Sequence, residues 1–79
     1  MAFIHAKQFN KIEKNRNSVH KPADATYTTF EHRGKKYFQI DTYGSADRLM
    51  PEKVSQSIQI DEEMARKLID VLKHEFFIE

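Results

Sequence analysis

The chain has 79 residues, of which 39% are hydrophobic and 32% charged, which is typical of one small folded domain and not of a disordered segment. It contains no cysteine, so disulfides, thiolate metal sites and cysteine catalysis are excluded. No apolar run approaches the roughly 18 residues that a membrane-spanning helix needs. The first residues also lack the apolar core of a signal peptide, so we expect an intracellular, cytoplasmic protein.

Charge is divided unevenly along the chain, although the net formal charge is only +1. Residues 1–37 contain eight Lys or Arg and three Asp or Glu, whereas residues 38–79 contain five and nine. A basic first half favours an anionic partner. The alternative is that the first half contains a solvated loop and the second half the acidic first turn of a helix, and both interpretations stay open.

Two segments come before the main predicted sheet. In residues 2–9, Phe3 and His5 alternate with Ile4 and other side chains in a pattern that predicts a short strand. Residues 10–25 are polar, and their sparse apolar side chains show no period, which is typical of a polar, mobile loop. A loop of this length in a small domain is either functional or disordered.

A β-hairpin is predicted next. Residues 26–32 (TYTTFEH) are rich in strand-forming side chains, and Arg33-Gly34 predicts a tight turn. The partner strand is residues 36–43 (KYFQIDTY), in which Phe38 and Ile40 alternate with tyrosine and polar side chains. This period of two indicates one buried face and one solvated face.

The next predicted strand, residues 53–60 (KVSQSIQI), follows a charged connection over residues 44–52 and leads directly into a helix. Asp61 is suited to cap that helix, because its carboxylate can accept hydrogen bonds from N–H groups of the first turn. Apolar residues at helical spacing from Met64 onward predict a helix from Glu62 to Phe77. We expect its apolar stripe to pack on a sheet face that contains Phe30, Phe38, Ile40, Ile58 and Ile60.

These elements predict an α+β fold with a single domain over residues 1–79. The expected architecture is a three- to four-stranded antiparallel sheet with one C-terminal helix packed on one face, in the order β-β-β-β-α. Residues 76–78 are three consecutive bulky apolar side chains, which are hard to bury in one small domain. We therefore expect a homodimer through the C-terminal helix, and the alternative is that these side chains close the monomer core.

Signatures of catalysis are weak. Asp41, Asp47 and Glu52 match no carboxylate motif, and the histidines lack the spacing of metal ligands. Gly34 and Gly44 are the only glycines, so there is no glycine-rich phosphate-binding loop. We expect a protein that is not an enzyme and that uses no metal or other cofactor.

The predicted solvated face combines aromatic and basic side chains. Tyr37 and Tyr43 alternate onto this face, and we expect Tyr27 to join them. The basic residues at the nearby strand ends and connections are Arg33, Lys35, Lys36, Arg48 and Lys53. Aromatic faces for stacking, with cations for phosphates, are what a single-stranded nucleic acid requires. The alternatives are that the tyrosines cover the sheet or fill a dimer interface, and Asp41 on the same face disfavours a purely anionic ligand.

Two resemblances extend these expectations. The block FQIDTYGSADRLMPEKVSQSIQIDEEMARKLIDVLKHEF resembles a group of small bacterial and phage-associated proteins with no assigned activity. The strand KYFQIDTY, the strand KVSQSIQI and the helix that follows at once resemble the positive-cofactor-four family of transcriptional coactivators. The second resemblance implies a four-stranded sheet with one helix, dimerisation through that helix, and single-stranded DNA binding on the sheet.

The sequence thus predicts a non-catalytic, single-stranded nucleic-acid-binding module that serves transcription or replication. The alternative is a small protein–protein interaction module, such as an accessory factor or inhibitor of a phage or mobile element. It would bind a protein partner through the connection over residues 43–53 or through an exposed sheet edge.

Overall fold

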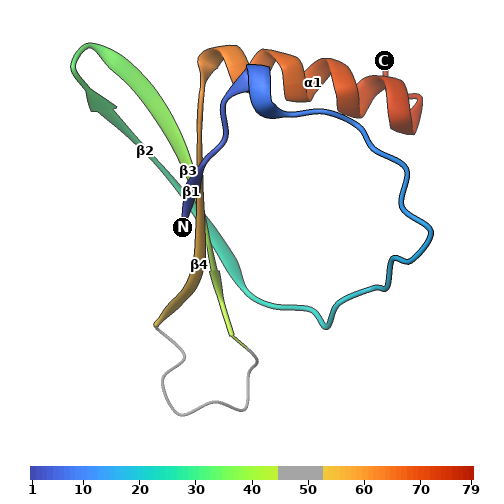
Figure 1. Cartoon of the computed structure of the whole chain (residues 1–79). Helices are drawn as coiled ribbons and strands as arrows, with labels where there is room; N and C mark the ends of the chain where they lie inside the picture. The colour runs from blue at the N-terminus through green and yellow to red at the C-terminus, as the bar shows by residue number, and fades with distance from the viewer. Residues whose placement is uncertain (45–52) are drawn as a thin grey trace.

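The computed structural model describes residues 1–44 and 53–79, which form one four-stranded sheet and one α-helix (Figure 1). The elements are β1 (Ala2–Phe3), the 3-10 helix η1 (Ala6–Gln8), β2 (Ala25–His32), β3 (Lys35–Tyr43), β4 (Val54–Asp61) and α1 (Glu62–Phe76). The predicted α+β fold with a C-terminal helix is confirmed. No helix in the described part of the chain is long and apolar enough to cross a membrane.

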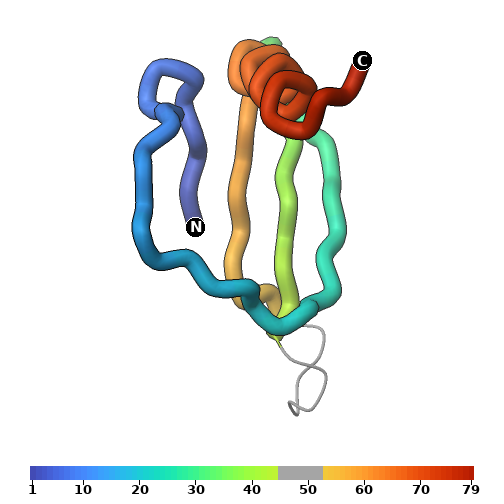
Figure 2. Tube along the Cα trace, turned by 90° about the vertical axis from the view of Figure 1, so that its right-hand side faces the viewer, coloured from blue at the N-terminus to red at the C-terminus, as the bar shows by residue number. Residues whose placement is uncertain are grey.

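The strands lie in the order β1-β4-β3-β2, side by side as Figure 2 shows. β2, β3 and β4 pair antiparallel, whereas β1 runs parallel to β4, with Ala2 opposite Ile58 and Phe3 opposite Gln59. The sheet is therefore mixed and not purely antiparallel, because the short first strand adds to the far side of β4.

The strand predicted over residues 2–9 ends at Phe3, so that prediction is wrong beyond this residue. The chain turns into η1, where Ala6 is buried against Ile60 and Met64 and Phe9 packs beside them. The Lys67 ammonium donates to the backbone carbonyl oxygens of Ala6 and Phe9, at 2.5 and 2.7 Å. Carbonyl groups that a strand would pair with a neighbour are held here by a lysine of the helix.

The hairpin of β2 and β3 closes through Arg33 (φ 53°) and Gly34 (φ 79°), as predicted. Two central residues with positive φ give the turn whose twist matches the twist of antiparallel strands. This turn sets the register, in which Phe30 lies opposite Tyr37 and Thr29 opposite Phe38. Residues directly opposite share a face, so Phe30 lies on the face away from Phe38. Its predicted place in the apolar face is wrong.

The register divides the sheet into two faces with different neighbours. The helix-side face contains Tyr27, Thr29, Lys36, Phe38, Ile40, Ile58 and Ile60. The open face contains Phe3, Phe30, Tyr37, Gln39, Asp41 and Gln59. Alternation along the strands places successive side chains on opposite faces, so the alternation predicted for β3 is confirmed. The predicted contrast in burial is absent, because residues 37–43 are half-buried on both faces.

The helix begins at Asp61, whose Oδ1 accepts a hydrogen bond from the Met64 backbone N–H at 2.9 Å, as predicted. Met64 is buried in the core together with Ala6 and Ile60, and Leu68 packs against them. Figure 1 shows that α1 then projects away from the sheet and does not lie along it. The apolar stripe therefore contacts the sheet only through the first turns.

Residues 10–24 form an arch without regular secondary structure, and all their side chains are exposed. Figures 1 and 2 show this arch running from η1 to the start of β2, on the same side of the sheet as the helix. An ion pair of 3.1 Å between Lys11 Nζ and Glu75 Oε2 links the arch to the end of α1. The polar loop predicted here is thus present as an irregular segment.

Candidate functional site

Three aromatic rings from three strands meet on the open face. The Phe30 ring stacks on Tyr37 with centroids 5.3 Å apart and an interplanar angle of 11°. Phe3 contacts the other side of this group edge-on, with its centroid 5.7 Å from that of Tyr37. Phe3 and Phe30 remain 40% and 39% exposed, so this aromatic row (Phe3, Tyr37, Phe30) keeps ring surface available to a ligand.

Tyr43 provides a second aromatic group at the far end of β3. Its hydroxyl shares a hydrogen bond of 3.0 Å with the Thr26 hydroxyl, which holds the phenol beside the open-face residues of β2. Six residues separate Tyr37 from Tyr43, so the two rings are about 20 Å apart along the strand. An extended ligand could contact both rings, whereas a single small ring could not.

A row of polar side chains fills the space between these aromatic groups. The Gln59 amide nitrogen donates to the Gln39 carbonyl oxygen at 2.8 Å. The Gln39 amide nitrogen in turn donates to both carboxylate oxygens of Asp41, at 2.9 and 3.2 Å. This polar row (Gln59, Gln39, Asp41) crosses from β4 to β3 and is half-buried.

The predicted basic residues are distributed unequally between the two faces. Lys35 lies on the same face as Tyr37 by alternation, and Arg33 lies in the adjoining turn. Lys36 faces the other way, onto the helix-side face. Lys53 is exposed just before β4, and Arg48 lies outside the described residues, as do Asp47 and Glu52. Lys35 and Arg33 therefore lie toward the hairpin end of the aromatic row, whereas Lys36 faces the helix side. Lys35 also lines a hollow together with Asp61 and Glu62.

Tyr27 does not join Tyr37 and Tyr43, so that prediction is wrong. It lies opposite Ile40 on the helix-side face, where its ring stacks on Phe38 with centroids 5.0 Å apart and an interplanar angle of 16°. The reason is the register: the same two-residue turn that moves Phe30 onto the open face moves Tyr27 off it.

The sequence prediction did not include several residues of this site, for two different reasons. Phe30 and its place on the open face could have been found by counting back from the Arg33-Gly34 turn to Tyr37. Phe3 and Gln59 lie side by side only because β1 pairs with β4, and no local sequence pattern predicts this distant pairing. His5, whose ring meets Phe3 edge-on at 5.7 Å, depends on the same pairing.

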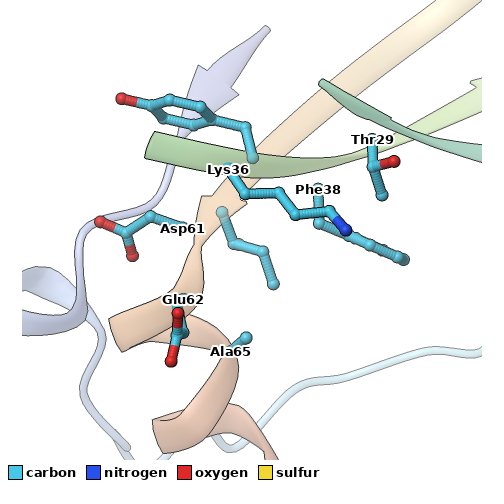
Figure 3. Close-up of a pocket in the computed structure, with 8 residues that line it drawn as sticks. Thr29, Lys36, Phe38, Asp61, Glu62 and Ala65 are labelled. Carbon is cyan, nitrogen blue, oxygen red and sulfur yellow. The ribbon is translucent and has the colours of Figure 1, made fainter. Parts of the chain in front are cut away.

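The helix-side face also carries a hollow, of about 290 Å³, where the sheet meets the start of α1 (Figure 3). Phe38 and Ile60 contribute apolar side chains, Lys36 lies alongside Phe38, and Glu62 and Ala65 line it from the helix. It is open to solvent and continues the uncovered part of this face. Its lining is that of an incompletely covered core more than that of a polar binding site.

Within residues 1–44 and 53–79, no group of three or more His, Asp or Glu side chains is placed to hold a metal ion. Comparison of the chain with protein-family models, with curated proteins and with solved structures gives no match. The chemistry of the open face therefore has to be inferred from its own residues.

Proposed function

We propose that this protein is a non-catalytic module that binds single-stranded nucleic acid on the open face of its sheet. The observation that carries the proposal is the aromatic row, in which Phe3 and Phe30 flank Tyr37 and remain partly exposed. Stacking of a base on an aromatic side chain contributes about 1–3 kcal/mol, and it tolerates any base because every base has a π-face.

Charge and polarity on this face fit the same ligand. Lys35 and Arg33 lie at the hairpin end of the aromatic row, where they can hold phosphates. The polar row offers hydrogen-bonding groups on the same face, between Tyr37 and Tyr43. Stacking surfaces, cations and edge-binding groups are thus combined on one side of the sheet.

Titration of a fluorescent single-stranded oligonucleotide by anisotropy, at low and at physiological salt, tests this function. We expect micromolar or tighter binding that weakens as salt rises, because bound phosphates release counterions. Absence of binding even at low salt would contradict the proposal.

We also propose that the binding unit is a homodimer, because one chain is too open to be a complete globule. The chain exposes 7515 Å² of surface, whereas a compact monomer of 9.4 kDa exposes about 5,000 Å². Its radius of gyration is 14.9 Å, against about 12 Å for a compact domain of this length. Among the described residues only Ala6, Ile60 and Met64 form the buried apolar core.

The surfaces that a second copy would cover are on the helix side. Ile69, Leu72 and Phe76 are 53%, 42% and 68% exposed along the projecting half of α1. Tyr27 and Ile58 are exposed on the neighbouring sheet face. In a two-fold dimer the helix end of each chain can cover the sheet face of the other. The same helix–sheet contact then occurs twice by symmetry.

The free edge of β2 favours a second candidate function, which is binding of a protein by strand addition. The Tyr43 N–H donates to the Asp24 carbonyl at 3.0 Å, so alternate residues of β2 turn their backbone groups toward β3 and the others outward. The outward set is Ala25, Tyr27, Thr29 and Glu31. A pulldown from nuclease-treated lysate, with wild type and with Thr29→Pro as bait, tests strand addition. We expect wild type to recover a partner protein in stoichiometric amount and Thr29→Pro to lose it. Recovery of the same amount of protein by both baits would contradict this function.

A further inference from the structure

We infer that the open face selects bases that carry an exocyclic amino group, cytosine above all, over thymine and uracil. The inference rests on the proposed nucleic-acid function and adds base preference to it. It follows from the direction of the hydrogen bonds in the polar row, which ends at the Asp41 carboxylate, a group that offers a ligand acceptors only.

The direction of the row is set at Asp41. An ionised carboxylate can only accept hydrogen bonds, so the Gln39 side chain must turn its NH₂ group toward Asp41. The Gln39 carbonyl oxygen then faces Gln59, which must donate to it with its own NH₂ group. The Gln59 end of the row therefore keeps a carbonyl oxygen and one N–H, whereas the Asp41 end has carboxylate oxygens only.

The two ends of the row lie where base edges would be. Gln59 is opposite Phe3 in the register of β1 and β4, so its amide adjoins the aromatic row. Asp41 is on β3 between Tyr37 and Tyr43, and its neighbour across β2 is Thr26, which holds the Tyr43 hydroxyl. A base stacked between Tyr37 and Tyr43 would therefore turn an edge toward the Asp41 carboxylate, whereas the Gln59 amide beside the aromatic row can accept or donate.

Base chemistry decides the preference. Cytosine presents an N4 amino group, and an Asp or Glu carboxylate is the side chain that accepts from it. Thymine and uracil present a carbonyl oxygen at that position, which cannot donate to the row and is repelled by a carboxylate. A base that covers the carboxylate without donating to it removes hydration and adds no hydrogen bond, so it binds more weakly. We expect oligo-dC to bind roughly tenfold more tightly than oligo-dT of equal length.

This preference also explains how a face that binds a polyanion can contain the Asp41 carboxylate: the carboxylate would contact base edges and not phosphates. The cations near the site, Lys35 and Arg33, lie at the hairpin end, whereas Asp41 lies within the sheet. Phosphates and base edges would thus meet different charges on one face.

Competition anisotropy with oligo-dC and oligo-dT of equal length tests the inference on wild type and Asp41→Asn. An asparagine keeps the shape but can turn its own NH₂ group outward and donate to a carbonyl. Wild type should prefer oligo-dC about tenfold, and Asp41→Asn should bind both oligonucleotides with similar affinity. The matched control is Asp70→Asn, an exposed carboxylate of α1 with the same change of charge, which should keep the wild-type preference.

Side-chain amide resonances of Gln39 and Gln59 in the wild-type protein give an independent readout that needs no variant. They should shift on addition of oligo-dC and much less with oligo-dT at equal saturation. Equal affinity of the wild type for the two oligonucleotides, or an unchanged preference in Asp41→Asn, would overturn the inference while leaving nucleic-acid binding in place. Failure of both oligonucleotides to bind would instead reject the proposed function itself.

Discussion

The two faces of the sheet both carry stacked aromatic pairs, yet they differ in what surrounds those pairs. On the open face, Tyr37 is flanked by Phe3 and Phe30, and the polar side chains beside it hydrogen-bond to one another. On the helix-side face, Tyr27 stacks on Phe38 with little else over it, and α1 covers only the upper end.

This difference separates two kinds of exposed surface. The open face is ordered within one chain, because its polar side chains hydrogen-bond to one another and its rings contact each other. On the helix-side face, α1 covers only part of the apolar surface, and exposing the rest costs a single chain stability. We therefore propose that the open face binds a polar, extended ligand and that a second copy of the chain covers the helix-side face.

The largest effect is expected from a charge on the projecting half of the helix. Leu72→Glu should dissociate the dimer and lower the free energy of unfolding by about 3 kcal/mol or more, because it leaves an unpaired charge in the proposed interface. Light scattering and thermal melting measure the two effects. His74→Glu, on a different side of the same turn, should leave both nearly unchanged. A wild-type monomer at micromolar concentration would contradict the interface.

The next effect separates the faces on a single strand. Phe30→Ala should weaken oligonucleotide binding about tenfold, since a stacking contact contributes about 1–3 kcal/mol. Tyr27→Ala, on the same strand but the opposite face, should leave oligonucleotide affinity unchanged in anisotropy titrations. Equal losses in the two variants would mean that the faces are not divided in this way.

A smaller effect is expected at Asp61, where the sheet passes into the helix. Asp61→Ala removes the carboxylate that accepts the Met64 N–H, and helix caps of this type contribute about 1 kcal/mol. Chemical denaturation should show this loss, whereas Asp61→Asn should retain most of the stability, because its carbonyl oxygen can still accept. A loss of the same size in both variants would indicate that the cap is not the cause.

The smallest effect should come from the hydrogen bond that holds Tyr43. Thr26→Val keeps the shape of the side chain but removes the 3.0 Å contact with the Tyr43 hydroxyl, at a cost of roughly 0.5–1.5 kcal/mol. We expect a slightly lower melting temperature and a small loss of oligonucleotide affinity. An increase in affinity would show that Tyr43 is better placed without this bond.

Features that depend on neighbours in sequence could be predicted from the sequence. The Arg33-Gly34 turn, the Asp61 cap and the alternation of β3 each follow from the conformational preferences of a few adjacent residues. These local signals are sufficient for the hairpin, the helix and the order of the last three strands.

Features that depend on distant pairing could not be predicted in this way. The parallel addition of β1 beside β4 joins residues far apart in the chain, and it brings Phe3 to the aromatic row. Hydrophobicity alone places Phe30 on the apolar face of the sheet and Tyr27 on the solvated face. The register set by the turn places each on the opposite face. Composition indicates which side chains are apolar, whereas pairing decides which of them meet.

The most direct test of the division between faces is an NMR titration of the wild-type protein with single-stranded oligo-dC. We expect the signals of Phe3, Phe30, Tyr37 and Gln39 to shift. The signals of Tyr27, Ile58 and Leu72 should keep their chemical shifts. Shifts concentrated on Tyr27, Ile58 and Leu72, or no shifts at saturating oligonucleotide and low salt, would contradict it.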